Sequence, residues 1–258
     1  MKNRIGDDFM EGFNVLMYHE LIKKEDFNFN NPSHIKVKQD YDDVLPSVLF
    51  AYAEEFEKQM KYLYDMGYKT LELSEVEDYY YYDKPLPEKS VLLTFDDMYK
   101  SVYLYAYPIL KKYNFKAVGF VVLDWLFEEV QDYSSSSSVC MCKNELESMR
   151  DVFQFANHTK GLHKRTSENT LVETIDKESF IRDLSCCEAF ADFKGAFAYP
   201  FGGYNEKVID NLKELGFKLG FTSKPGKNTR TTNPFELHRN GVLVNITLEN
   251  FKAILENN

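Results

Sequence analysis

The sequence lacks the features that mark membrane, secreted and nucleic-acid-binding proteins. It has no apolar run of the roughly 18–20 residues needed to span a membrane, and no basic cluster. The first residues, MKNRIGDDFMEGF, contain no apolar signal core, so we expect a cytoplasmic protein, or an extracellular or cell-surface one whose export segment has been removed. The net charge of −10 argues against a nucleic-acid partner.

Cysteine is scarce, and its spacing points to neither zinc nor disulfides. The four cysteines are Cys140, Cys142, Cys186 and Cys187. A C-x-C pair and a C-C pair match no common zinc motif, and adjacent cysteines rarely bond to each other. We therefore expect four reduced, structural thiols.

Two polar segments interrupt an otherwise regular pattern. Residues 24–50, punctuated by Asn and Pro, are expected to form a long loop. Residues 132–138, DYSSSSS, are of low complexity and are expected to be a solvated connector or, alternatively, a lid over a site.

The rest of the chain alternates short apolar runs with helical patterns. Hydrophobic residues make up 44% of the sequence, enough for one sizeable core. The expected strands are 14–19, 91–95, 117–123, 152–157, 195–199, 218–222 and 242–246, and the expected helices are 56–66, 101–113, 145–150, 176–190 and 205–215. This alternation predicts an α/β fold of parallel βα units, a closed or partly open (β/α) barrel, in one domain spanning residues 1–258.

Residues able to do chemistry follow several of these strands. The carboxyl ends of barrel strands build the active site, and here they carry His19, Asp96, Asp97 and His158, with His163 in the same loop as His158. One aspartate and two histidines suit zinc or another borderline divalent ion. Taken alone, the two histidines could also be unrelated surface residues, but the paired carboxylates favour a metal site.

Five motifs in order carry a resemblance to a known family. They are VLMYHEL, LTFDD, NHTKGLH, FAYPFGGY and LHRNGV, and they cover nearly the whole chain. The sequence resembles the polysaccharide deacetylases of the NodB-homology group, carbohydrate esterase family four. The six-residue histidine motif is most similar to the branch that deacetylates poly-β-1,6-N-acetylglucosamine.

The resemblance implies a distorted (β/α) barrel and a metal-dependent reaction. It implies that Asp97, His158 and His163 hold a divalent metal, by default Zn²⁺, with Co²⁺, Ni²⁺ or Fe²⁺ as alternatives. Asp96 would be the general base that takes a proton from a metal-activated water. The backbone N–H of Phe201 would stabilise the tetrahedral oxyanion.

Other positions are matched less closely. The resemblance suggests His238, next to Arg239, as the general acid, and His19, Tyr199 and Pro200 as residues that contact the substrate. His19, at the end of the first expected strand, could have any of several active-site roles.

The sequence departs from the family pattern at three points. Met98 replaces a glycine, so a left-handed backbone there would be strained and we expect the loop to differ slightly. Ala198 replaces an arginine that orients the base, and the usual fourth motif is missing, which leaves the group that orients Asp96 undetermined.

Together these observations predict a hydrolase that removes N-acetyl groups from a β-linked N-acetylhexosamine polysaccharide, with an acetylated glycan as its partner. Two alternatives remain open. One is a related metal-dependent hydrolase, such as an O-acetyl esterase of a surface or capsular sugar or a small-molecule amidase. The other, suggested by Met98 and by the missing arginine, is a catalytically inactive glycan-binding relic of the same fold.

Overall fold

A curled, mostly parallel sheet forms the centre of the molecule. The computed structural model describes residues 12–30 and 32–256, so residues 1–11, on which the prediction of location rests, lie outside the described part. The main path of the sheet runs β12-β11-β10-β8-β7-β1. These strands are β1 (Phe13–Tyr18), β7 (Ser90–Asp96), β8 (Ala117–Val121), β10 (Phe153–Asn157), β11 (Ala196–Ala198) and β12 (Leu219–Phe221). Neighbours along this path are parallel, as the βα alternation predicts.

The segment 237–241 fills the gap between the two ends of this path. On one side Leu237 forms a parallel bridge with Phe221 of β12. On the other side β14 (Asn240–Gly241) pairs in parallel with β1. The sheet is thereby curled into the (β/α) barrel expected from the sequence. Two short strands, β6 (Lys69–Thr70) and β13 (Lys227–Asn228), add to β7 and β1.

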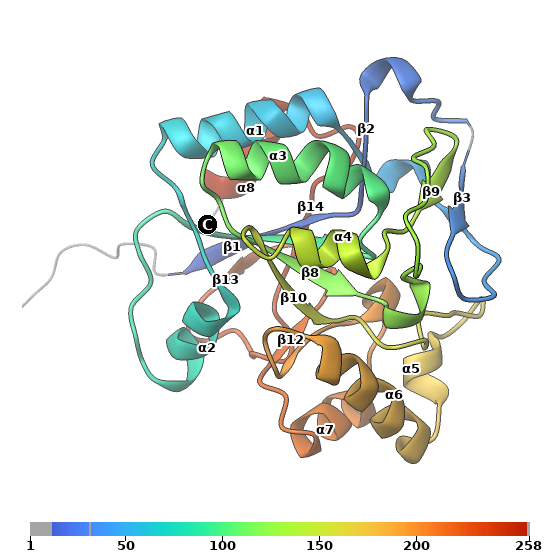
Figure 1. The fold of residues 1–258 in the computed structure, drawn as a ribbon. Coiled ribbons are helices and arrows are strands. Elements are labelled where there is room, and N and C mark those ends of the chain that lie inside the picture. Colours follow the sequence, from blue (N-terminus) through green and yellow to red (C-terminus); the bar gives the residue numbers. More distant parts are fainter. Residues whose placement is uncertain (1–11, 31, 257–258) are drawn as a thin grey trace, which may run out of the picture.

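Helices cover the outside of the sheet in two groups (Figure 1). One group lies together on one side and consists of α1 (Ala53–Asp65), α3 (Tyr107–Lys112) and α8 (Leu248–Glu256). The opposite side carries α5 (Leu171–Thr174), α6 (Lys177–Phe190) and α7 (Glu206–Glu214), and the remaining helices are α2 (Leu73–Tyr81) and α4 (Lys143–Ser148). Among the described residues, no helix combines the length and the apolar character that crossing a bilayer requires.

Side-chain alternation along β7 explains where its last residue points. Val91 and Phe95 pack in the core outside the barrel, whereas Leu92 packs in the inner core. Because successive side chains on a strand face opposite sides, Thr94 and Asp96 share the inner face with Leu92. The strand therefore ends with a carboxylate directed into the barrel at its carboxyl-terminal end.

The two polar segments are more ordered than the sequence indicates. The expected loop at 24–50 contains β3 (Ser33–Lys36) and β4 (Val44–Leu45), and its last residue begins β5 (Phe50–Tyr52), which pairs with β2 (Glu20–Ile22). The end of the serine-rich run forms β9 (Ser137–Val139), which pairs in parallel with β3. The Ser138 hydroxyl, buried there, donates to that of Ser33 at 3.0 Å, so serine satisfies its polar group inside this small sheet. The prediction of a solvated connector is wrong for this part.

Most other elements agree with the prediction, with a few differences. The helix expected at 101–113 opens with a π-helical turn, Val102–Ala106, before Pro108 enters the first turn of α3. The strand expected at 242–246 is absent from this described region, because pairing with β1 occurs earlier, in β14. Helices α2, α5 and α8 were not predicted. The four cysteines are free, and all except Cys186 are buried.

Candidate active site

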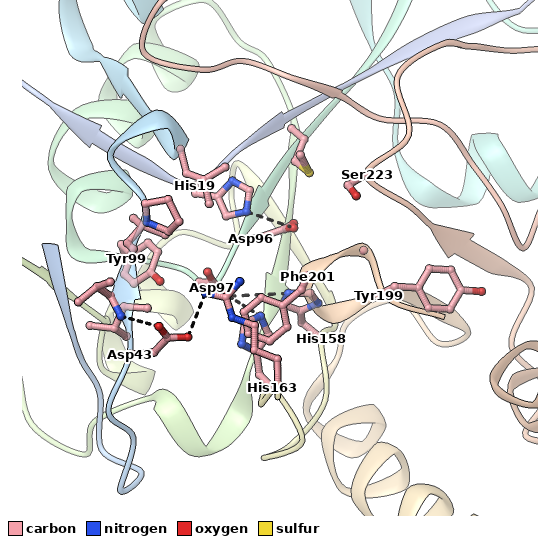
Figure 2. Close-up of a pocket in the computed structure, with 18 of the residues that line it drawn as sticks. His19, Asp43, Asp96, Asp97, Tyr99, His158, His163, Tyr199, Phe201 and Ser223 are labelled. Carbon is pink, nitrogen blue, oxygen red and sulfur yellow. Dashed lines mark hydrogen bonds and ion pairs between the residues drawn. The ribbon is translucent and has the colours of Figure 1, made fainter. Parts of the chain in front are cut away.

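A cavity of about 250 Å³ lies at the carboxyl ends of the strands, with the β3–β4 segment along one side (Figure 2). Seven of the nine residues predicted for the site line it: His19, Asp96, Asp97, His158, His163, Tyr199 and Phe201. Pro200 and His238 are not among its lining residues. The strand-end reasoning therefore identified most of the polar centre of the cavity.

Asp97, His158 and His163 converge on one point. The Oδ1 atom of Asp97 lies 3.7 Å from Nε2 of His158 and 3.5 Å from Nε2 of His163. The three ligand atoms lie within 4.8 Å of one another, and all three residues are buried. The Nδ1–H of His158 donates to the carbonyl of Ala198 at 2.8 Å, which leaves Nε2 as the atom with a free lone pair.

The residues of this cluster fit a divalent metal. Oδ1 of Asp97 is buried without a hydrogen-bond partner, an arrangement that costs free energy unless a cation balances it. Burial, and secondly the charge of Asp96, raise the pKa of Asp97 to about 8 in the absence of a cation. A divalent ion would favour the ionised form of Asp97, and one oxygen with two imidazole nitrogens is a donor set that zinc accepts.

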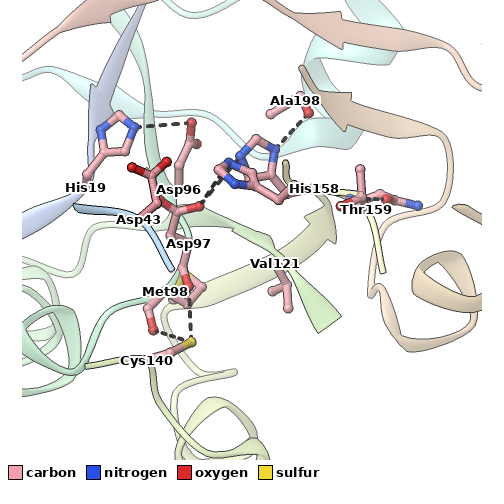
Figure 3. A network of polar contacts seen from close by, with 12 residues as sticks. His19, Asp43, Asp96, Asp97, Met98, Val121, Cys140, His158, Thr159 and Ala198 are labelled. Carbon is pink, nitrogen blue, oxygen red and sulfur yellow. Dashed lines mark hydrogen bonds and ion pairs between the residues drawn. The ribbon is translucent and has the colours of Figure 1, made fainter. Parts of the chain in front are cut away.

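An unusual turn directs Asp97 into the cluster. Asp97 and Met98 both have left-handed backbones, with φ of 68° and 57°, which few non-glycine residues adopt. The neighbouring segment stabilises the turn. The Cys140 thiol donates to the Asp97 carbonyl at 3.3 Å (Figure 3). The Met141 N–H donates to the Met98 carbonyl at 3.1 Å.

The Met98 side chain is fully buried and occupies the space beside Gly119, which has no side chain to fill it. A Cβ atom built on Gly119 would lie only 2.6 Å from the sulfur of Met98. Residue 98 thus keeps the left-handed backbone that the family's glycine would adopt without strain, although it is a methionine here. Burial of the Met98 side chain and the two contacts from residues 140 and 141 offset the strain.

Asp96 is held by an arginine whose role the sequence analysis did not assign. The guanidinium of Arg239 donates to both carboxylate oxygens of Asp96, at 2.7 and 2.8 Å, and its Nε–H donates to the Thr222 carbonyl at 2.8 Å. Burial alone would raise the pKa of Asp96, but the charge of Arg239 and its hydrogen bonds oppose burial and keep that pKa below its usual range. Asp96 is therefore ionised at neutral pH. Arg239 supplies the guanidinium that was expected at the position of Ala198.

His19 lies on the other side of Asp96 from His158 (Figure 3). Its Nε2 atom is 3.8 Å from Oδ2 of Asp96, and it lines the cavity. Burial lowers the pKa of His19 to about 4, although the Asp96 charge opposes that change. His19 is therefore a neutral imidazole at neutral pH.

The structure does not bring His238 into the cavity. Arg239 points into the barrel, and the adjacent residue of an extended segment points the opposite way. The His238 ring packs against Gly226, and its backbone is paired with the side chain of Asn228 through hydrogen bonds of 2.8 and 2.9 Å. This placement argues against His238 as the general acid.

Three further positions around the FAYPFGGY motif have different surroundings. The Tyr199 hydroxyl donates to the Phe235 carbonyl at 2.8 Å and its ring points away from the cavity (Figure 2), so the expected substrate contact of this side chain is not supported. Pro200 is buried and is not among the residues that line the cavity. Phe201, with φ of 55°, lines it, and its ring centroid lies 4.3 Å from that of His163.

The rim contains a charged pair that sequence reasoning missed. Asp43, from the segment expected to be a loop, lies with Oδ2 3.4 Å from a terminal nitrogen of Arg165. The Arg165 guanidinium is centred 4.6 Å from the centroid of the Phe201 ring. Asp43 follows no expected strand of the barrel, and Arg165 lies further along the loop after residues 152–157 than the two histidines, so the strand-end rule did not single them out.

Comparison with known proteins gives consistent results. A family model described as polysaccharide deacetylase matches residues 83–220. The chain is 32% identical over 195 residues to a poly-beta-1,6-N-acetyl-D-glucosamine N-deacetylase of Staphylococcus aureus, an alignment that covers 72% of this chain. It spans 65% of the length of that relative.

Two solved structures share the fold over nearly the whole chain. The Streptococcus pyogenes deacetylase PplD, in complex with acetate, matches with a TM-score of 0.74 and 24% identity, covering 95% of this chain and 98% of its own. IcaB from Ammonifex degensii matches with a TM-score of 0.71 and 23% identity, covering 95% and 96%. These similarities establish the barrel architecture.

Proposed function

Because this chain belongs to the polysaccharide deacetylase family, we propose that it is a metal-dependent hydrolase that removes N-acetyl groups from a β-linked N-acetylhexosamine polysaccharide. The identity to the S. aureus enzyme supports poly-β-1,6-N-acetylglucosamine as the polymer. The observation that carries the proposal is an ionised Asp96 beside the Asp97, His158 and His163 cluster. We assign the activity to one catalytic domain spanning residues 1–258.

Asp97, His158 and His163 would hold the metal ion. Zn²⁺ suits this set best, and Co²⁺, Ni²⁺ and Fe²⁺ accept the same ligands. When bound, such an ion polarises a carbonyl and lowers the pKa of a water molecule.

Asp96 acts as the general base. It accepts a proton from the water whose oxygen attacks the acetyl carbon, and the two hydrogen bonds from Arg239 fix the direction of the carboxylate. The carbonyl oxygen gains negative charge as the tetrahedral oxyanion forms. The backbone N–H of Phe201, at the cavity wall beside His163, donates a hydrogen bond to that oxygen.

His19 delivers the proton to the leaving nitrogen. Since His19 is neutral at neutral pH, it first takes up the proton that Asp96 accepted, across a gap of 3.8 Å. When the carbon–nitrogen bond breaks, that proton passes to the nitrogen, and acetate and a free amine leave. His19 replaces His238 in this role because it is the histidine that lines the cavity beside Asp96.

Two structural findings weigh against an inactive relic. Arg239 supplies the guanidinium that Ala198 lacks, and the turn at Met98 still directs Asp97 into the cluster. An O-acetyl ester presents the same acetyl carbonyl, so the distinction between amide and ester must come from turnover.

The experiment is acetate release from a β-1,6-linked N-acetylglucosamine oligomer by zinc-loaded protein, with and without a chelator. We expect release that the chelator abolishes and added metal restores. An O-acetylated glycan is assayed in parallel, and Asp97→Asn serves as the metal-site control. Equal turnover with and without the chelator, or turnover of the O-acetyl substrate alone, contradicts the proposal.

A further inference from the structure

Asp43 and Arg165 form a charged pair at the mouth of the cavity, next to the proposed metal ligands. Asp43 precedes β4, and Arg165 follows His163 by two positions in the loop after β10. The pair therefore joins the β3–β4 segment to the loop that carries a metal ligand. In Figure 3 the Asp43 carboxylate lies beside Asp97.

The Asp43 carboxylate can accept more hydrogen bonds than it receives. A carboxylate offers about four lone-pair directions. One oxygen accepts the Val44 N–H at 2.8 Å, while the Arg165 guanidinium and the Tyr41 hydroxyl are both 3.4 Å from the other. The Asp43 side chain is 25% exposed and lines the cavity. It is thus a fixed acceptor that faces the space where a sugar would bind.

The chemistry of the substrate suggests what this acceptor recognises. In N-acetylglucosamine, the carbon bearing the acetamido group is followed around the ring by those bearing O3 and O4. A carboxylate on that side of the reacting centre is within reach of these two hydroxyls. A carboxylate paired with a guanidinium suits adjacent hydroxyls, which donate to the one and accept from the other.

The glycosidic linkage of the polymer determines whether O3 and O4 both carry a free hydroxyl group. A β-1,6-linked residue keeps O3–H and O4–H, whereas a β-1,4-linked residue uses O4 in the glycosidic bond. We propose that Asp43, positioned by Arg165, accepts hydrogen bonds from O3 and O4 of the residue being deacetylated and thereby selects β-1,6-linked over β-1,4-linked polymers. This inference rests on the proposed deacetylase function.

The test compares acetate release from β-1,6-linked and β-1,4-linked N-acetylglucosamine pentamers by zinc-loaded wild type and Asp43→Asn. We expect wild type to prefer the β-1,6 pentamer. Because a hydrogen bond to a charged group is worth roughly 10- to 100-fold in affinity, Asp43→Asn should lose about that factor in kcat/KM on the β-1,6 pentamer, mainly through KM. The loss on the β-1,4 pentamer should be several times smaller.

A modified substrate tests the contact without depending on the fold of a variant. With wild type, a β-1,6 pentamer of 4-deoxy residues should lose activity by a factor similar to that of Asp43→Asn. The two changes combined should lose little more than either one. Asp42→Asn is the matched control, because Asp42 is an exposed neighbour that does not line the cavity.

The outcomes separate this inference from the function on which it rests. Absence of linkage preference in wild type, equal losses of Asp43→Asn on both pentamers, or full activity on the 4-deoxy pentamer would each overturn the role of Asp43 while leaving the deacetylase function intact. No acetate from either pentamer with zinc-loaded wild type contradicts the deacetylase function itself, and the role of Asp43 falls with it.

Discussion

Arg239 donates hydrogen bonds to both carboxylate oxygens of Asp96, although 143 residues separate the two in the chain. The Arg239 side chain is 1% exposed, so the pair is shielded from water and from salt. Removal of one partner from a buried ion pair leaves an unbalanced charge, so Asp96 depends on Arg239 for its charge balance.

Arg239→Gln should move the acid limb of the pH profile. Arg239 opposes the effect of burial on Asp96, so without it the pKa of Asp96 rises. Asp96 is then ionised only at higher pH, and the acid limb of kcat/KM moves to higher pH with a lower maximum. Stability should fall by about 3–5 kcal/mol. The measurement is kcat/KM against pH with metal content checked, and an unmoved acid limb in a fully metal-loaded variant would contradict the role of Arg239.

Asp97→Asn should change how the stability of the metal-free protein depends on pH. Asp97 has a pKa of about 8 when folded against an ordinary value of 3.8, so the stability it contributes is present below about pH 4 and declines up to about pH 8. Between pH 6.5 and 8 the wild type should lose melting temperature relative to Asp97→Asn. Glu20, whose pKa is also about 8, is present in both proteins, and most of its contribution cancels because burial is the main cause of its shift and the Asp97 charge only a lesser one.

Addition of zinc to the same thermal unfolding measurements provides the control. Zinc should raise the melting temperature of wild type at pH 8 and do so far less for Asp97→Asn, since the ion favours ionised Asp97. Parallel pH curves for the two metal-free proteins would show that Asp97 is not the group whose pKa is raised.

Separate substitutions of His19 and His238 test which of the two is the general acid. His19→Gln should lower kcat by roughly 10²–10⁴-fold, the usual contribution of a general acid, with metal content unchanged. His238→Gln should retain most activity because its ring packs against Gly226 outside the cavity. Steady-state acetate release measures both variants, and a larger loss for His238→Gln would reverse the assignment.

Gly119→Ala should disturb the turn that positions Asp97. The new methyl group would lie 2.6 Å from the Met98 sulfur and 2.8 Å from a ring carbon of Phe155, so the core must shift. Such overpacking costs about 1–3 kcal/mol, and we expect weaker metal binding as well. Gly241→Ala is the matched control, since its methyl group would meet Leu243 at an ordinary 3.4 Å. Chemical denaturation and zinc titration measure the two effects, and equal behaviour of both variants would contradict this account.

The strand ends and the metal cluster could be predicted because they follow from local rules. Alternation along β7 fixes which aspartate faces inward, and parallel strands bring their carboxyl ends to one edge. His158 and His163 lie in one loop after β10, so they could be grouped with Asp97 without knowledge of contacts between distant segments.

The missed features depend on contacts between distant segments. The role of Arg239 requires knowing that segment 237–241 enters the barrel between β12 and β1. The serine-rich run becomes a strand because β3 offers it a partner, and its own composition carries no such information. Asp43 reaches the cavity because β3 and β4 fold back over the site.

The position of Arg239 late in the chain orders the appearance of the site during synthesis. During translation, Asp97, His158 and His163 are synthesised before Arg239. Until segment 237–241 inserts between β12 and β1, a nascent or prematurely terminated chain has its metal ligands but not the partner of its base. The proposed hydrolysis therefore depends on the last part of the barrel to be synthesised, because Asp96 has no arginine partner until that segment is in place.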